Sequence, residues 1–230
     1  MKFLICFALK EEAAPFRKIA AGKSSFIILL TGIGRQNAEK CVREFLAGGA
    51  SVPASRSQDQ ARLARTLAPP DLVLTCGFAG GLNPDLKLGD VIFEIGNRKS
   101  EIGNQLVAAG AKPAKIFCAD RIATTVAEKK KLRDENSADA VEMESAAIHA
   151  VCDERGIPCV TVRVISDTAS EDLPLDFNAL AKPDKNLDYG KLAWAIAKSP
   201  RKIGALIELQ KKTSFAAEQL AAVLDKIVFD

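Results

Sequence analysis

Three carboxylates in this sequence stand just past the ends of predicted strands, where side chains can meet at one edge of a sheet. Glu12 follows the first strand, Glu144 lies where a strand gives way to a helix, and Asp167 follows a strongly apolar strand. A carboxylate at the end of an element often only caps a helix, so each of these alone is more often structural than catalytic. Convergence of all three would instead indicate general acid–base chemistry.

Two glycine-rich segments also follow strands. In Cys76-Gly-Phe-Ala-Gly-Gly-Leu82, three glycines fall within five residues, which would let the backbone approach a ligand, although a turn or bulge is the simpler interpretation. Thr31-Gly-Ile-Gly34 imitates the start of a dinucleotide-binding fingerprint. However, Asn37 stands where the third glycine belongs, and no acidic residue ends a strand about 20 residues later. We interpret this segment as a tight strand-to-helix turn.

The elements that position these residues alternate between strand-like and helix-like patterns. Apolar runs of strand length occupy residues 3–8, 26–31, 71–76, 90–93, 115–118, 138–141 and 159–165. Helical spacing of apolar residues occurs at 11–21, 36–46, 144–154 and 215–227. Near-continuous apolar strands between helices predict an α/β sheet covered on both faces. The polar segment 48–70 is expected to be a surface excursion rather than a linker, which predicts a single domain over residues 1–230.

Composition excludes several classes of protein. The chain has 230 residues, and 32 Lys and Arg against 29 Asp and Glu leave a net charge of +3. That balance argues against a strongly basic nucleic-acid binder or a polyacidic tail protein. Hydrophobic residues make up 48% of the chain, too many for a disordered protein. Aromatic residues make up only 6%, so the core must be built from Ala, Leu, Ile and Val.

Cysteine usage predicts a reduced, cytoplasmic protein. The six cysteines form no Cys-x-x-Cys pair, and His149 is the one histidine, so neither a zinc site nor a cofactor is expected. Most of the cysteines lie in apolar stretches, where a thiol behaves as a small hydrophobe. Residues 3–9 form an apolar run that is too short for a signal sequence, and no segment reaches the roughly 18 apolar residues of a membrane span.

Four segments taken together resemble the nucleoside phosphorylase superfamily. They are Ala8-Leu-Lys-Glu-Glu12, Thr31-Gly-Ile-Gly34, Gly77-Phe-Ala-Gly-Gly-Leu82 with Leu88-Gly-Asp90, and Val141-Glu-Met-Glu144 with Arg163-Val-Ile-Ser-Asp167. Their order and spacing are most similar to the methylthioadenosine/S-adenosylhomocysteine nucleosidase branch. The resemblance covers most of residues 1–185 and implies a three-layer α/β/α sandwich around a mixed, partly closed sheet. It also implies cleavage of the N-glycosidic bond of an adenosine-type nucleoside.

The resemblance assigns roles to single residues. Asp167 matches the general acid that protonates the leaving purine at N7, and Glu12 matches the base that activates water. Glu144 matches the carboxylate that binds the ribose hydroxyls. The other expected substrate-binding residues surround these three carboxylates. They are Met143 on the sugar, Phe78, Ala79 and Gly80 near the ribose, Ile122 near the purine, and Ser166. Family members are usually homodimers or larger, so we expect a dimer.

Water is the expected nucleophile, although phosphate remains the alternative. Breaking the bond builds an oxocarbenium-like sugar and negative charge on the base, which an acid at the purine neutralises. Phosphate needs arginines or a nest of backbone amides, whereas this chain has Lys10-Glu-Glu12 after its first strand. Besides a hydrolase, we keep open a phosphorylase and a nucleoside-binding protein that has lost catalysis.

Three departures from the family pattern concern the substrate. Phe78 stands where the nucleosidases usually carry a small residue, and Ile122 stands near the position of an aromatic residue that stacks on the purine. The segment 95–115 is also shorter than its counterpart. Residues 167–177 are similar to a subgroup that includes hopanoid-pathway nucleosidases, which act on adenosyl-hopane. That similarity implies a bulky 5′ substituent.

Three further features have structural rather than functional interpretations. His149 is expected to be a structural or surface histidine. The run Lys129-Lys-Lys131 could be a small anion-binding patch, but a solvated helix face is the favoured interpretation. The helix at residues 215–227 carries Glu218, Asp225 and Lys226, so it is expected to pack against the protein or another subunit rather than a membrane.

Overall fold

The structure is a computed structural model that describes residues 2–22, 26–48, 69–96, 102–180 and 202–229. Its strands are β1 (Phe3–Phe7), β2 (Phe26–Leu30), β3 (Leu72–Gly81), β4 (Val91–Ile95), β5 (Lys112–Pro113), β6 (Ile116–Cys118), β7 (Ala140–Glu142) and β8 (Cys159–Asp167). Its helices are α1 (Lys10–Ile19), α2 (Arg35–Leu46), α4 (Ile102–Ala108), α5 (Val126–Asn136), α6 (Ser145–Glu154), α7 (Phe177–Leu180) and α9 (Lys202–Phe229).

One mixed sheet holds all of these strands. Its main path runs β2-β1-β3-β8-β4-β5, and β7 pairs with both β3 and β6 off that path. β1, β2, β3 and β8 run parallel to one another, whereas β4 is antiparallel to β8 and β7 is antiparallel to β3. The pairing of β7 with the end of β3 gives the sheet a second branch, in keeping with the expected mixed, partly closed sheet.

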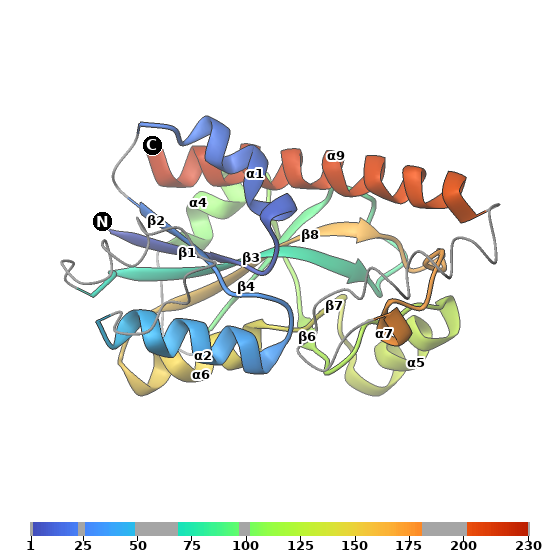
Figure 1. Cartoon of the computed structure of the whole chain (residues 1–230), viewed down its shortest axis with the longest axis horizontal. Coiled ribbons are helices and arrows are strands. Elements are labelled where there is room, and N and C mark those ends of the chain that lie inside the picture. Colours follow the sequence, from blue (N-terminus) through green and yellow to red (C-terminus); the bar gives the residue numbers. More distant parts are fainter. Residues whose placement is uncertain (1, 23–25, 49–68, 97–101, 181–201, 230) are drawn as a thin grey trace.

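Helices cover both faces of the sheet, which makes the three layers that the sequence predicts (Figure 1). On one face, α1, α4 and α9 enclose a core of residues that includes Phe7, Phe16, Leu106 and Leu224. On the other face, α2 and α6 enclose a second core. All nine residues of β8 are buried, because a central strand with neighbours on both sides and helices on both faces has no exposed surface.

The third strand is longer than the sequence predicts. We expected it to end at Gly77 in a turn, but β3 continues through the glycine-rich segment to Gly81. Its pairing with β8 shifts register between Ala79 and Gly80, so the bulge interpretation of this segment is correct and the turn interpretation is wrong. The glycines stay extended because their backbone groups pair with β8 along the strand and with β7 at its end.

The C-terminal helix agrees with expectation. The last 45 residues are expected to be mostly helical, and α9 covers Lys202–Phe229 of them. Its buried residues include Ala216, Leu220 and Leu224, which lie in the amphipathic stretch 215–227. Most of the segment 48–70, expected to be a surface excursion, lies outside the described residues. Within the described part of the chain, no helix combines the length and apolarity needed to cross a membrane.

Candidate active site

One cavity of about 230 Å³ is lined by every site residue that the sequence predicts. These residues come from the start of α1, from β3, from the segment between β6 and α5, from the β7–α6 junction and from β8: Glu12, Phe78, Ala79, Gly80, Ile122, Met143, Glu144, Ser166 and Asp167. The C-terminal ends of the parallel strands β3 and β8 meet at this edge of the sheet (Figure 1), where open α/β sheets bind ligands. The topology therefore assembles what the sequence scatters over 156 positions, from 12 to 167.

Glu12 connects the first helix to the third strand. Its Oε2 accepts a hydrogen bond from the backbone N–H of Leu9 at 2.8 Å, and its Oε1 accepts one from the backbone N–H of Phe78 at 2.9 Å. Its side chain is buried, with the residue only 4% exposed. Burial raises the pKa of Glu12, and the two hydrogen bonds and the charge of Arg163 offset this only in part. A raised pKa brings a carboxylate closer to the range of a useful general base.

Gly77 makes room for this contact. Its φ is +153°, and a Cβ placed there would lie 2.7 Å from both Glu12 Oε1 and Arg163 Nη1. Real Cβ atoms do not approach heavy atoms so closely, so a side chain at this position would displace a carboxylate or a guanidinium. The glycine therefore permits Glu12 and Arg163 to meet beside β3.

Arg163 lies at the centre of a buried cluster of charges that the sequence analysis did not include in the site. Its Nη2 donates to Glu142 Oε2 and, at 3.2 Å, to Thr75 Oγ1, and it lies 3.6 Å from Glu144 Oε2. Ser145 and the backbone N–H of Glu144 also donate to Glu142. Burial would raise the pKa of Glu142, but Arg163 and these hydrogen bonds lower it overall.

Glu144 is the carboxylate in this cluster that resists ionisation. Burial and the neighbouring charge of Glu142 raise its pKa to about 7, although Arg163 and a hydrogen bond from Gly34 oppose the rise. The Gly34 backbone N–H donates to Glu144 Oε1 at 2.8 Å. Gly34 is the residue just before α2. The carboxylate of Glu144 therefore accepts a hydrogen bond from a backbone amide at the start of that helix. The glycine turn thus serves the site itself, which agrees with its interpretation as a strand-to-helix turn.

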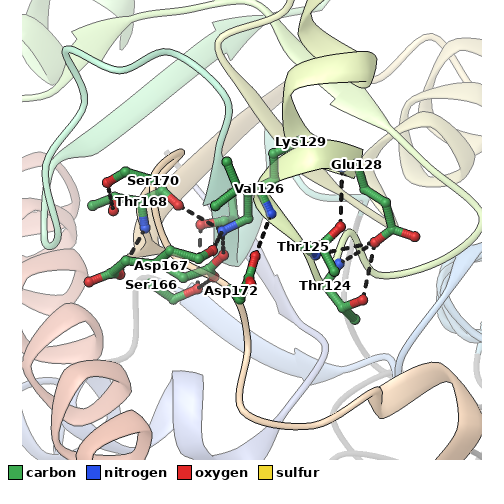
Figure 2. Close-up of polar contacts among 12 residues, drawn as sticks. Thr124, Thr125, Val126, Glu128, Lys129, Ser166, Asp167, Thr168, Ser170 and Asp172 are labelled. Carbon is green, nitrogen blue, oxygen red and sulfur yellow. Dashed lines mark hydrogen bonds and ion pairs between the residues drawn. The ribbon is translucent and has the colours of Figure 1, made fainter.

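Asp167 is held from two sides (Figure 2). Ser166 Oγ donates to its Oδ1 at 2.8 Å, and the ammonium of Lys129 lies 2.6 Å from its Oδ2. Lys129 also donates to the backbone carbonyls of Thr168 and Glu171, each at 2.7 Å. Lys129 is fully buried, so the expectation that the lysine run forms a solvated helix face is wrong for Lys129, although Lys130 and Lys131 are exposed.

The structure adds apolar residues to the cavity wall. Leu173, Phe177 of α7 and Leu209 of α9 line it together with Ile122. Asn178 makes two hydrogen bonds with the backbone of Ile122, each of 2.9 Å, which fixes Ile122 beside α7. Aromatic residues therefore line the cavity at Phe78 and Phe177, although not at the position of Ile122.

His149 is structural in its contacts. Its Nε2 lies 2.8 Å from Thr161 Oγ1, and it is absent from the residues that line the cavity. Burial lowers its pKa. The six cysteines are all free and buried, as expected for thiols that act as small hydrophobes.

Sequence signals differ for the residues that we missed. Arg163 interrupts an otherwise apolar strand, and a charge in such a place indicates a buried partner. Glu142 lies two residues before Glu144 in the same motif, so its place near the site could be predicted, but its pairing with Arg163 could not. The lysine run gave no signal that distinguishes Lys129, because the next two residues are also lysines and are exposed.

Comparison with known proteins identifies the family of the chain. The family described as Phosphorylase superfamily matches residues 111–193. The 5'-methylthioadenosine/S-adenosylhomocysteine nucleosidase of Shewanella sp. (strain MR-7) is 31% identical over 222 residues, which cover 78% of this chain and 89% of that protein. The aminodeoxyfutalosine nucleosidase of Campylobacter jejuni is 30% identical over 137 residues, 46% of this chain and 60% of that protein.

Solved structures share the fold over nearly the whole chain. Futalosine hydrolase of Helicobacter pylori superposes with a TM-score of 0.66 at 19% identity and covers 99% of this chain and 97% of its own. The 5'-methylthioadenosine/S-adenosylhomocysteine nucleosidase of Neisseria meningitidis, in complex with methylthio-immucillin-A, superposes with a TM-score of 0.65 at 18% identity, covering 99% and 98%. The chain therefore belongs to the phosphorylase superfamily, and its relatives there include 5'-methylthioadenosine/S-adenosylhomocysteine nucleosidases and an aminodeoxyfutalosine nucleosidase.

Proposed function

We propose that this protein is a nucleosidase that hydrolyses the N-glycosidic bond of an adenosine-type nucleoside and releases the free purine. The observation that carries the proposal is one cavity lined by Glu12, Glu144 and Asp167. These carboxylates can supply a base for water, a partner for the ribose hydroxyls and an acid for the purine. Relatives with 30–31% identity are named as nucleosidases.

The reaction divides between these groups. Asp167 gives a proton to the purine as the C–N bond breaks and its electron pair moves to the base. Glu144 accepts hydrogen bonds from the ribose hydroxyls, and these strengthen as the sugar becomes cationic. Glu12 takes a proton from the attacking water, and its raised pKa suits that task. Met143 packs on the sugar, while Phe78, Ala79 and Gly80 border the ribose and Ser166 orients Asp167.

Charge in the cavity favours water over phosphate. The charged side chains along its wall are the carboxylates Glu12, Glu142, Glu144 and Asp167 and the guanidinium of Arg121. Arg121 is 63% exposed at its side chain and pairs with Glu128. Behind this wall, Arg163 is already paired with Glu142 and Lys129 with Asp167. Among the described residues, no unpaired cation at the cavity is therefore left to bind a phosphate dianion, so a phosphorylase is the weaker alternative.

The 5′ substituent of the substrate is proposed to be apolar and bulky. Leu173, Phe177 and Leu209 give one part of the cavity wall an apolar surface, and the similarity of residues 167–177 to hopanoid-pathway nucleosidases points the same way. Adenosine derivatives with 5′-alkylthio groups of increasing length test this idea. We expect kcat/KM to rise with chain length, and a maximum at methylthioadenosine would contradict it.

A nucleoside panel assayed for free base with and without phosphate tests the function. We expect release of adenine in water alone, with ribose and not ribose 1-phosphate as the second product. Strict dependence on phosphate would establish the phosphorylase. Measurable nucleoside binding without any product would establish a binding protein that has lost catalysis.

We further propose that the protein is cytoplasmic and forms a homodimer. The free, buried cysteines support a reducing compartment, and the resemblance to the family supports the dimer. Sedimentation equilibrium measures the oligomeric state directly, and a monomer at micromolar concentration would exclude the dimer.

A further inference from the structure

Lys129 is the one buried ammonium among the described residues that contacts a proposed catalytic carboxylate. It projects from the start of α5, and its side chain has no exposed surface. A capping box of Thr125 and Glu128 and a hydrogen bond from the Val126 N–H to Asp172 Oδ1, of 2.6 Å, hold this end of the helix in place (Figure 2). The position of the ammonium is therefore set by the helix and not by a flexible surface chain.

The three donors of this ammonium meet three acceptors. Two are the carbonyls of Thr168 and Glu171, and the third is Asp167 Oδ2. Lysine has donors only, so Oδ2 must accept and cannot hold the proton that goes to the purine. That proton must therefore be carried by Oδ1, the oxygen that contacts Ser166.

A neutral group could satisfy the two carbonyls, so the charge requires a separate explanation. Burying a cation is unfavourable unless a counter-charge compensates it, and the start of a helix disfavours positive charge. Asp167 supplies the compensating charge once it has given up its proton. In a site with little water this attraction is stronger than it would be at the surface.

Other charges around this pair are already engaged or lie across the cavity. Glu171 pairs with Lys212 of α9, Glu128 pairs with Arg121, and Asp172 caps α5. Among the described residues, the other charged groups near Asp167 line the cavity, stand behind its wall or line the neighbouring groove: Glu12, Glu142, Glu144, Arg163 and Glu208.

We propose that Lys129 is a positioning residue that stabilises the carboxylate formed when Asp167 gives its proton to the leaving base. This inference rests on the proposed function. In the step, the O–H bond at Asp167 Oδ1 breaks, an N–H bond forms on the purine, and the electron pair of the C–N bond moves into the base. Lys129 keeps its own protons throughout, and its charge neutralises the new carboxylate.

Three variants separate the charge of Lys129 from its role as a donor. Lys129→Gln removes the charge but keeps two N–H donors for the carbonyls. Lys129→Arg keeps a charge that cannot be titrated away. Lys130→Gln is the matched control, since Lys130 is the next residue of the same helix and is exposed. Circular dichroism and thermal melting establish that each variant is folded.

The first measurement needs no substrate. Carboxyl ¹³C NMR follows the titration of Asp167, whose resonance is assigned by its loss in Asp167→Asn. In Lys129→Gln this resonance should titrate at higher pH than in the wild type, while Lys129→Arg and Lys130→Gln should match the wild type. Coincident titrations in all four chains would overturn the proposal and leave Lys129 as a tether for residues 168–171.

The second measurement is the pH dependence of kcat with a cleaved nucleoside. In Lys129→Gln the alkaline limb should move to higher pH by the same amount, and the limiting kcat should fall by about tenfold because the acid is weaker, with little change in KM. An unchanged limb would contradict the proposal. If no nucleoside is cleaved by the wild type, the proposed function fails while the NMR titration still decides the role of Lys129.

Unfolding of Lys129→Gln would not block the test. In the wild-type chain, the ¹⁵Nζ resonance of Lys129 should move with the Asp167 titration, and this movement should vanish in Asp167→Asn. An Nζ resonance whose chemical shift stays constant while Asp167 titrates would also overturn the proposal.

Discussion

The backbone N–H of Gly34 donates a hydrogen bond of 2.8 Å to Glu144 Oε1, across 110 positions of the chain. This hydrogen bond joins the turn after β2 to the β7–α6 junction. Glu144, the residue proposed to bind the ribose hydroxyls, is therefore oriented by a turn that is distant in the sequence. Gly34 has φ +86° and ψ 159°, a conformation that a residue with a side chain adopts only with strain.

Replacement of Gly34 tests this link. We expect Gly34→Ala to move the N–H away from Glu144 and to raise KM by about tenfold, because one oriented hydrogen bond to the carboxylate is lost. Gly22→Ala is the matched control, since Gly22 has φ +83° and open space around it. Both variants should lose stability, but loss of substrate affinity in both would disprove a specific role for Gly34.

The raised pKa of Glu144 makes stability depend on pH. Its folded-state pKa of about 7 exceeds the ordinary value of 4.5, so its contribution is fully present below pH 4.5 and is lost as pH rises through about 7. Glu144→Gln removes that loss and should be more stable than the wild type at pH 8.5, by on the order of 2 kcal/mol, and equal to it at pH 4. Chemical denaturation at both pH values measures the difference.

Asp167→Asn should remove the acid and leave the fold. We expect kcat to fall by about 10²–10⁴-fold, with an unchanged circular dichroism spectrum. Free adenine measured by chromatography reports the rate, and turnover close to that of the wild type would exclude Asp167 as the acid.

Glu12→Gln should abolish the base and keep only one of the two hydrogen bonds that Glu12 accepts from Leu9 and Phe78, since the amide has a single acceptor oxygen. The raised pKa of Glu12 places the rise of kcat/KM with pH above the ordinary range of a glutamate, and this rise should disappear in the variant. Glu11→Gln is the control, because Glu11 is the exposed neighbour on α1. Equal pH profiles for wild type and Glu12→Gln would assign the base elsewhere.

Phe78→Ala should change the choice of substrate more than the rate of the chemistry. The contact of Phe78 with Glu12 uses its backbone N–H, so the substitution leaves that hydrogen bond in place and enlarges the cavity. We expect the ratio of kcat/KM between methylthioadenosine and longer 5′-alkylthio analogues to change by about tenfold. An unchanged ratio would show that Phe78 does not border the 5′ substituent.

Much of the fold could be predicted because its central strands are buried on both faces and its helices are amphipathic. The predicted strand at 159–165 and helix at 36–46 differ from β8 and α2 by two residues or fewer at each end. β5 could not be predicted, since its two residues are exposed and carry no periodic pattern. The extension of β3 was hidden because glycine has low strand propensity, and only pairing with β8 and β7 keeps it extended.

The candidate site was predictable as a set of positions but not as a network. Motifs identified Glu12, Glu144 and Asp167, whereas the partners of those residues are set by topology. Gly34 and Lys129 belong to segments that the sequence analysis singled out, but no local pattern shows that they contact Glu144 and Asp167. The roles of the site residues, and the single domain over residues 1–230, remain predictions that the experiments above address.

The central ladder of β3 and β8 has a practical consequence. Slow amide exchange is expected where backbone hydrogen bonds are buried and flanked by packed layers, and these two strands meet both conditions while their ends form the cavity wall. The cavity therefore belongs to the part of the protein that opens last. Heat inactivation should coincide with global unfolding, so a thermal-shift assay can serve as a direct screen for nucleoside analogues that bind the cavity.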